Sequence, residues 1–258
     1  MSSLPEKQTT SIATSTPDDV FIRDKSLCKE LIGKISFTEM IYFQVLGTLP
    51  TPAQTAIVDA CLVTLMEHGL TPSALATRLI YSSAEEAMQA AVAAGLLAVG
   101  SRFVGTTEGA GELLARIVAA GDDGAAEAQR IAVAFKTEKK SLPGFGHPFH
   151  KPDDPRSPVL LALARQHGVA GAHVRAVELL SAAIDATYGK HITLNATGAI
   201  AAVLADAGIP RQILRGFALI ARAAGLVGHV HEEQQKPAMR AIWEAGDAAV
   251  PYDGKTGR

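Results

Sequence analysis

The feature that most constrains the fold is a series of apolar stripes at helical spacing. One stripe is formed by Ile57, Val58, Cys61, Leu62, Leu65 and Met66. Polar Asp59, Thr64 and Glu67 lie off it, as a period of 3.6 residues requires. Stretches that alternate every two residues are scarce, and no strand–helix–strand alternation is visible. The sequence therefore predicts an all-α fold.

Helix start signals support this prediction. Thr51-Pro52 opens the stripe above, and Ser36–Glu39 and Ser83–Glu86 both fit the capping-box pattern. Further helices are predicted at 84–97, 111–120, 125–135, 159–167, 172–187, 196–207 and 211–227.

Composition excludes several classes of protein. Of 258 residues, 48% are hydrophobic, enough for a substantial core. The net charge of −2 gives no reason to expect nucleic acid or an anionic membrane as partner. Cys28 and Cys61 cannot form a four-cysteine zinc site, and nothing indicates a disulfide framework, so we predict a reducing, cytoplasmic location.

The N-terminal segment and the most apolar run of the chain each support a further prediction. Residues 1–20 are polar, rich in Ser, Thr and Pro, and lack an apolar core, so we expect a disordered tail rather than a signal peptide. The run Ala90–Val99 is too short to span a bilayer.

The longest stretch without helical periodicity is 136–155, and such segments are often functional. Gly144 and Gly146 let the backbone approach a ligand, and they present His147, which can donate to or accept from a reacting oxygen. The segment is not a dinucleotide fingerprint, because no strand precedes it. Taken alone, this segment is more typical of a surface loop, in which His147 would have no catalytic role.

Other polar residues allow two interpretations each. Arg156 can bind a carboxylate bidentately or be a solvated charge at a helix start. Arg222, inside an apolar helix, needs either a ligand carboxylate or an internal salt bridge. His68 follows the end of a predicted helix. Its ring can contact a substrate there, or it can interact favourably with the negative end of the helix dipole. His229 and His231 point apart on a helix, so we predict no metal site.

Together, these segments resemble the citrate synthase superfamily, from about residue 21 to 251. The matching runs are Glu30–Met40 (family DLIGKxSFTEM), Gly47–Pro52 (GrLPtp), Glu67–Gly69 (DHg), Pro143–His147 with Asp154–Arg156 (GxGH…DPR) and Ala221–His229 (R..G..aH). The run Gly95–Phe103 is similar to the GLLxxGxRF run in the lyase portion of ATP-citrate lyase. The chain most resembles the citryl-CoA lyase branch.

The resemblance implies an all-α homodimer whose large and small domains close on an oxo-acid and an acyl-CoA thioester. It places the small domain at 111–210 and a large domain, trimmed at its N-terminus, at 21–110 and 211–258. It also implies roles for single residues. His147 would polarise the oxo-acid carbonyl, His68 would contact the same acid, Arg156 and Arg222 would bind its carboxylates, and Lys151, with Gly144 and Gly146, would lie on the coenzyme A side.

Two departures from the synthases concern the acyl-CoA half. Phe103 stands where synthases have the histidine that steadies the thioester enolate, and Thr197 stands where they have the aspartate that removes the α-proton. A threonine hydroxyl is a poor base at neutral pH. Glu108 is the alternative base and a candidate substrate contact.

These departures favour cleavage over condensation, because cleavage needs a base only on the tertiary hydroxyl, a role that His147 can take. We predict a citryl-CoA lyase-like enzyme that forms acetyl-CoA and oxaloacetate and holds no permanent cofactor. The alternatives are synthase-type condensation, cleavage of another 3-hydroxyacyl-CoA, and a non-catalytic protein that binds coenzyme A or an oxo-acid.

Overall fold

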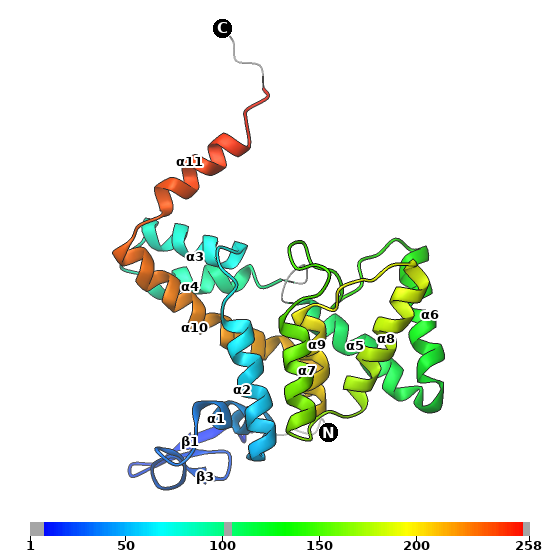
Figure 1. The fold of residues 1–258 in the computed structure, drawn as a ribbon. Helices are drawn as coiled ribbons and strands as arrows, with labels where there is room; N and C mark the ends of the chain where they lie inside the picture. Colours follow the sequence, from blue (N-terminus) through cyan, green and yellow to red (C-terminus); the bar gives the residue numbers. More distant parts are fainter. Residues whose placement is uncertain (1–7, 101–104, 255–258) are drawn as a thin grey trace, which may run out of the picture.

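The computed structural model describes residues 8–100 and 105–254, and it confirms the predicted all-α class (Figure 1). The α-helices in this part of the chain are α1 (Phe37–Leu46), α2 (Pro52–Met66), α3 (Pro72–Ser83), α4 (Met88–Leu97), α5 (Thr106–Ala119), α6 (Gly124–Thr137), α7 (Arg156–Gln166), α8 (Ala172–Tyr188), α9 (Ala196–Asp206), α10 (Leu214–Gln235) and α11 (Met239–Ala249). Short helical turns are η1 (Leu27–Leu31), η2 (Gly121–Asp123) and η3 (Arg211–Ile213).

Two of the three predicted helix starts are confirmed. Ser36 with Glu39 and Thr51 with Gln54 form reciprocal capping boxes at the starts of α1 and α2. The capping box predicted at Ser83 is wrong. Ser83 is the last residue of α3, and its hydroxyl donates to the Leu79 carbonyl at 2.9 Å. The next helix, α4, begins only at residue 88.

A second prediction, the disordered tail at 1–20, does not hold for the described residues 13–20, which form part of a small sheet. Strands β1 (Ala13–Ser15), β2 (Val20–Ile22) and β3 (Lys25–Ser26) form a small antiparallel sheet in the order β1-β2-β3. The buried Asp19 carboxylate holds it together by accepting from the Ser26 hydroxyl at 2.6 Å and the Val20 amide at 2.8 Å. The segment is therefore ordered by contacts within residues 12–28, and residues 1–7 lie outside the described part.

Helix α9 is the centre of the core. It packs against α5, α7, α8 and α2 (Figure 1). Its residues Ile200, Val203 and Leu204 are fully buried. The small residues Ala199, Ala201 and Ala202 are also fully buried, which lets neighbouring helices approach closely.

Helix α10 packs against α2, α3, α4 and α5. The span Arg211–Gln235 is long and apolar enough to cross a membrane by length and composition alone. A core helix of a water-soluble protein passes the same test, so this span is weak evidence for a membrane segment.

Two groups of helices can be followed in Figure 1. Helix α6 packs on α8 and α5 on α9, whereas α3 packs on α4 and both pack on α10. The predicted domain limits stay a prediction; the limit at residue 110 falls within α5. Helix α11 extends away from the body and has no buried residue.

Candidate functional site

A cavity of about 740 Å³ gathers most of the predicted site residues. Its walls come from the ends of α2 and α4, the starts of α3, α7 and α9, the segment 141–149, and α10. The predicted residues that line it are His68, Gly144, Gly146, His147, Arg156, Thr197 and Arg222. Groups from five separate parts of the chain therefore face one space.

The glycine-rich segment is fixed against the start of α9. Gly144 has φ +84°, and a Cβ on it would lie 2.8 Å from the Cα of Gly198. The Gly144 carbonyl accepts from the Asn195 amide at 3.0 Å, and the Gly146 carbonyl accepts from the Asn195 side chain at 2.9 Å. Gly144 thus allows a close backbone approach to Gly198, and the approach of this segment to a ligand stays a prediction.

His147 is held in one tautomer. Its Nδ1 accepts from the backbone amides of Phe149 at 3.1 Å and His150 at 3.0 Å. An acceptor Nδ1 carries no hydrogen, so these bonds assign the hydrogen of the neutral ring to Nε2. Burial lowers the pKa of His147, and the neighbouring His150 acts in the same direction. The ring is therefore a neutral hydrogen-bond donor.

His68 faces the same group of rings. Its ring centroid lies 5.7 Å from that of His147 and 5.8 Å from that of His150. Burial lowers the pKa of His68, and the positive charge of Arg156 adds to the effect. Among the described residues, no hydrogen bond occupies either of its ring nitrogens. His68 is therefore a neutral imidazole that can accept a proton.

The three histidines also form a group of potential metal ligands, with one ligand atom from each lying within 4.8 Å of the others. A metal-bound imidazole normally donates from its second nitrogen. The second nitrogen of His147 accepts instead, from two amides. This geometry suits hydrogen bonding to a substrate oxygen better than metal ligation.

Arg156 is positioned by Asp154, a residue that sequence reasoning did not single out. The fully buried Asp154 carboxylate accepts from Nε and Nη2 of Arg156 at 2.9 and 2.8 Å, and from the Ala196 amide at 2.9 Å. Burial alone would raise the pKa of Asp154, but the hydrogen bonds from Arg156 and Ala196 outweigh burial and hold it at about 2. In the described part of the chain, no partner takes up the remaining side-chain N–H groups of Arg156, so they can bind a ligand.

Arg222 projects from α10 with only 5% of its side chain exposed. Among the described residues, its Nε and Nη1 have no hydrogen-bond partner, and the Glu67 carboxylate lies 3.6 Å from Nη1. A buried guanidinium with unsatisfied donors is costly unless a ligand completes it. Burial lowers the pKa of Arg222, although the Glu67 charge opposes this. A carboxylate in the cavity would satisfy these donors.

Thr197 lines the cavity, but its hydroxyl is already engaged. It donates to the Asn195 side-chain oxygen at 2.6 Å, and the Thr106 hydroxyl lies 2.8 Å away. A threonine hydroxyl is a poor base at neutral pH, and the amide oxygen that accepts its hydrogen cannot take up the proton in its place.

Two other predicted residues, Glu108 and Lys151, lie outside the cavity lining. Glu108 does not line the cavity, and its carboxylate pairs with Arg215 at 2.6 Å. Lys151 is exposed and also lies outside the lining. Phe103 falls outside the described residues. Sequence reasoning did not assign roles to His150 or Asp154, although the DPR run already contained the second.

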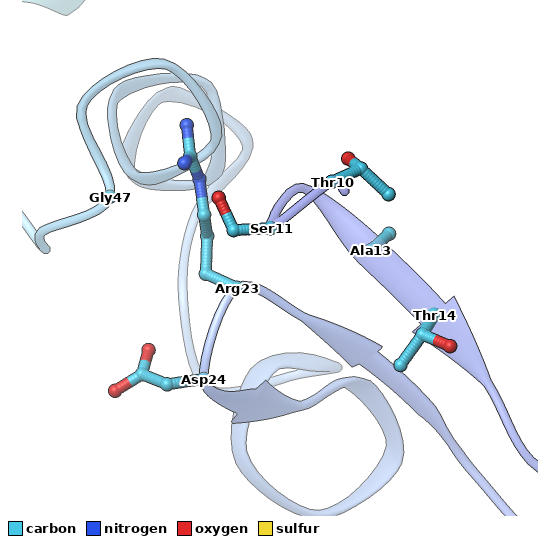
Figure 2. A pocket seen from close by; sticks show the side chains of 7 residues that line it. All are labelled: Thr10, Ser11, Ala13, Thr14, Arg23, Asp24 and Gly47. Carbon is cyan, nitrogen blue, oxygen red and sulfur yellow. The ribbon is translucent and has the colours of Figure 1, made fainter. Parts of the chain in front are cut away.

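A second hollow lies beside the N-terminal sheet, where Arg23 extends toward the end of α1 (Figure 2). The Arg23 Nη2 donates to the carbonyls of Gln44 and Val45 at 2.8 and 3.3 Å. A cation that satisfies the last carbonyls of a helix is a structural element, and this explains the residue without a ligand.

Known proteins share this architecture. The family model "Citrate synthase, C-terminal domain" matches residues 23–243. A citryl-CoA lyase structure from Hydrogenobacter thermophilus has a TM-score of 0.84 and 32% identity, covering 98% of this chain and 97% of that one. An ATP citrate lyase structure from Methanothrix soehngenii, in complex with citrate and coenzyme A, has a TM-score of 0.80 and 18% identity, covering 98% and 43%.

Among curated relatives, "Putative citrate synthase 2" of Mycobacterium tuberculosis is 29% identical over 191 residues, which cover 72% of this chain and 49% of the relative. The chain thus spans about half the length of the curated relatives it matches. The family match covers most of the chain, and the resemblance drawn from its motifs is confirmed. The chain belongs to the citrate synthase family.

Proposed function

We propose that the protein is a citryl-CoA lyase, which cleaves a citryl-CoA-type thioester to acetyl-CoA and oxaloacetate. The observation that carries this proposal is the similarity over nearly the whole of both chains to the H. thermophilus citryl-CoA lyase. The cavity supports it, because donors for an oxo-acid face the space and the hydroxyl of Thr197 is engaged at the position where synthases have a base.

In the proposed complex, Arg222 and the free N–H groups of Arg156 bind carboxylates of the oxo-acid half. Charge-assisted hydrogen bonds of this kind are stronger than neutral ones. Nε and Nη1 of Arg222 are buried donors that such a carboxylate would satisfy.

The proposed proton transfers follow from the states of two histidines. His147 carries its hydrogen on Nε2, and His68 is neutral. His147 donates from Nε2 to the tertiary oxygen, and His68 accepts the proton of that hydroxyl. The carbon–carbon bond then breaks, the oxygen becomes the carbonyl of oxaloacetate, and the electron pair passes to the acetyl-CoA enolate. The enolate takes a proton from water, and His68 returns its proton to the resulting hydroxide, which restores both the water and the neutral imidazole. A base role for His147 itself would require Nδ1 to release both amide donors.

Condensation of an acyl-CoA with oxaloacetate is the second candidate, since His147 as a donor would polarise a ketone equally well. The similarity to the mycobacterial putative citrate synthase favours it. The two functions differ in the need for a base at the α-carbon, where the hydroxyl of Thr197 is weak.

The test is to incubate the protein with citryl-CoA and, separately, with acetyl-CoA plus oxaloacetate, and to follow the coenzyme A species by mass. We expect acetyl-CoA from the first mixture and little citryl-CoA or citrate from the second. Rapid condensation with no cleavage would overturn the proposal in favour of a synthase. Binding of both ligands without turnover would indicate a non-catalytic protein.

We also propose that the protein acts without a permanently bound cofactor, as a homodimer in the cytoplasm. Both cysteines are free, which suits a reducing compartment. Exposed apolar side chains, among them Leu97, Val63 and Trp243, suit a subunit interface. Light scattering at micromolar concentration should give about twice 26.9 kDa; a monomer mass would contradict the dimer.

A further inference from the structure

One face of α10 meets the end of α2 beside the cavity. Arg222, Gly225 and His229 follow at steps of three and four residues, so they lie on one side of the helix. A Cβ on Gly225 would lie 2.1 Å from the Met66 carbonyl, which shows how closely the two helices approach. Glu67, the residue that follows α2, therefore lies between Arg222 and His229.

Glu67 contacts both of them and also the turn that carries His68. Its Oε1 lies 2.9 Å from Nε2 of His229 and 3.6 Å from Nη1 of Arg222. Its Oε2 accepts from the Gly69 amide at 2.9 Å. The distance to Arg222 is longer than a hydrogen bond, so the carboxylate remains near the guanidinium without occupying it.

His229 is itself held in one tautomer. Nε of Arg78 lies 3.1 Å from Nδ1 of His229, and a guanidinium can only donate. Nδ1 is therefore the acceptor, and Nε2 donates its hydrogen to Glu67. The His229 side chain is only 10% exposed.

Arg78 is anchored at the other end of this chain of contacts. Its side chain is 4% exposed, and Nη1 donates to the buried Glu233 carboxylate at 2.8 Å. Glu232 also pairs with it. The guanidinium therefore has little freedom to move away from His229.

We propose that Arg78 and His229 are positioning residues for the oxo-acid half of the substrate. They hold the Glu67 carboxylate back from Arg222 and so keep the guanidinium donors open to a ligand carboxylate. Without the His229 hydrogen bond, Glu67, which is 45% exposed, is free to close on Arg222 and to compete with the substrate. This proposal rests on the function proposed above.

The test compares three variants by calorimetry, with oxaloacetate and coenzyme A titrated separately. His229→Phe keeps the ring but removes both polar atoms, and should weaken oxaloacetate binding by about 10-fold or more, the order expected for a charge-assisted contact. Coenzyme A binding should not change. His229→Gln should retain oxaloacetate binding, because its amide can accept from Arg78 and donate to Glu67.

The double variant His229→Phe/Glu67→Gln tests the competition itself. Removing the charge of Glu67 should restore much of the lost oxaloacetate affinity, whereas a general structural defect would not be rescued. Should His229→Phe fail to fold, Arg78→Lys provides the second route. Lysine keeps the charge beside Glu233 but lacks the planar fork that reaches His229. It should weaken oxaloacetate binding in the same sense.

The outcomes separate the two proposals. Oxaloacetate affinity unchanged in His229→Phe, or equal losses of both ligands in all variants, would overturn the positioning role while leaving the lyase function in place. An unmodified protein that binds neither oxaloacetate nor citryl-CoA would overturn the proposed function, and the positioning role with it.

Discussion

The hydroxyl of Thr197 lies 2.8 Å from that of Thr106 and donates its hydrogen to the side-chain oxygen of Asn195 at 2.6 Å. The position that the family resemblance aligns with the α-proton base of synthases thus holds a small network of neutral groups at the edge of the cavity. A carboxylate at position 197 would replace the Thr197 hydroxyl in this network and would add a base that the network lacks.

Thr197→Asp should raise the exchange of acetyl-CoA α-protons with solvent, by roughly 10²-fold or more if the carboxylate reaches the α-carbon. The unmodified protein should exchange very slowly. Deuterium incorporation followed by mass spectrometry measures both rates. Thr197→Asn is the matched control, since it has similar size without a base. Brisk exchange by the unmodified protein would show that another base serves the acyl-CoA.

His147→Ala should lower the rate of citryl-CoA cleavage by at least about 10²-fold, because the Nε2 donor to the reacting oxygen is lost. Steady-state rates with intact folding by circular dichroism are the measurement. His167→Ala is the control, since His167 is exposed at the end of α7 and does not line the cavity. Equal losses in both variants would remove His147 from its special role.

Arg222→Met should weaken oxaloacetate binding by about 2–5 kcal/mol, the range for losing one partner of a buried charged contact. Arg156→Met should also weaken oxaloacetate binding. Part of its effect would come from Asp154, because the buried carboxylate would lose its guanidinium partner. Calorimetry with coenzyme A alone should show little change. The exposed Arg165→Met is the control, and a similar loss there would point to a general effect.

Stability should depend on pH through His191. Its Nδ1 and Nε2 lie 2.7 and 2.9 Å from the carboxylates of Asp185 and Asp153, and these hydrogen bonds raise the pKa of His191. The folded state thus binds the proton more tightly than the unfolded state. The stabilisation is therefore present below the ordinary histidine pKa of about 6.5 and is lost as pH rises through the higher folded value.

The test is to measure the urea midpoint of unfolding from about pH 5.5 to 8.5. The midpoint should fall as pH rises, and it should fall less steeply in His191→Gln. The effect should be small, because the side chain is largely exposed. An unchanged slope in the variant would assign the pH dependence to other groups.

Gly225→Ala should destabilise the fold by about 1–3 kcal/mol, since the new methyl group would collide with the Met66 carbonyl. Gly228→Ala, one turn along the same helix, meets nothing within 4 Å and should stabilise by about 0.5–1 kcal/mol through helix propensity. Chemical denaturation of the two variants gives both signs in one experiment. A neutral Gly225→Ala would show that α2 can move away from α10 at little cost.

The sequence by itself determined the helical class, several helix starts and the motifs that join His147, Arg156 and Arg222 to one family. These features depend on neighbours within a few turns of the chain: a period of 3.6 residues, a serine before a helix, a histidine after a glycine. The N-terminal sheet was missed because its strands are two or three residues long, too short for a visible alternation.

Only the tertiary structure decided the state of each site residue. His229 and Glu67 are 162 residues apart in the chain, and Arg78 and His229 are 151 apart, so no local pattern connects them. The hydrogen position on an imidazole, the pKa of Asp154 and the open donors of Arg222 depend on which groups lie within about 3 Å of them. The physical reason is that hydrogen bonds and burial act through space, and the packing of α10 on α2 brings the groups together.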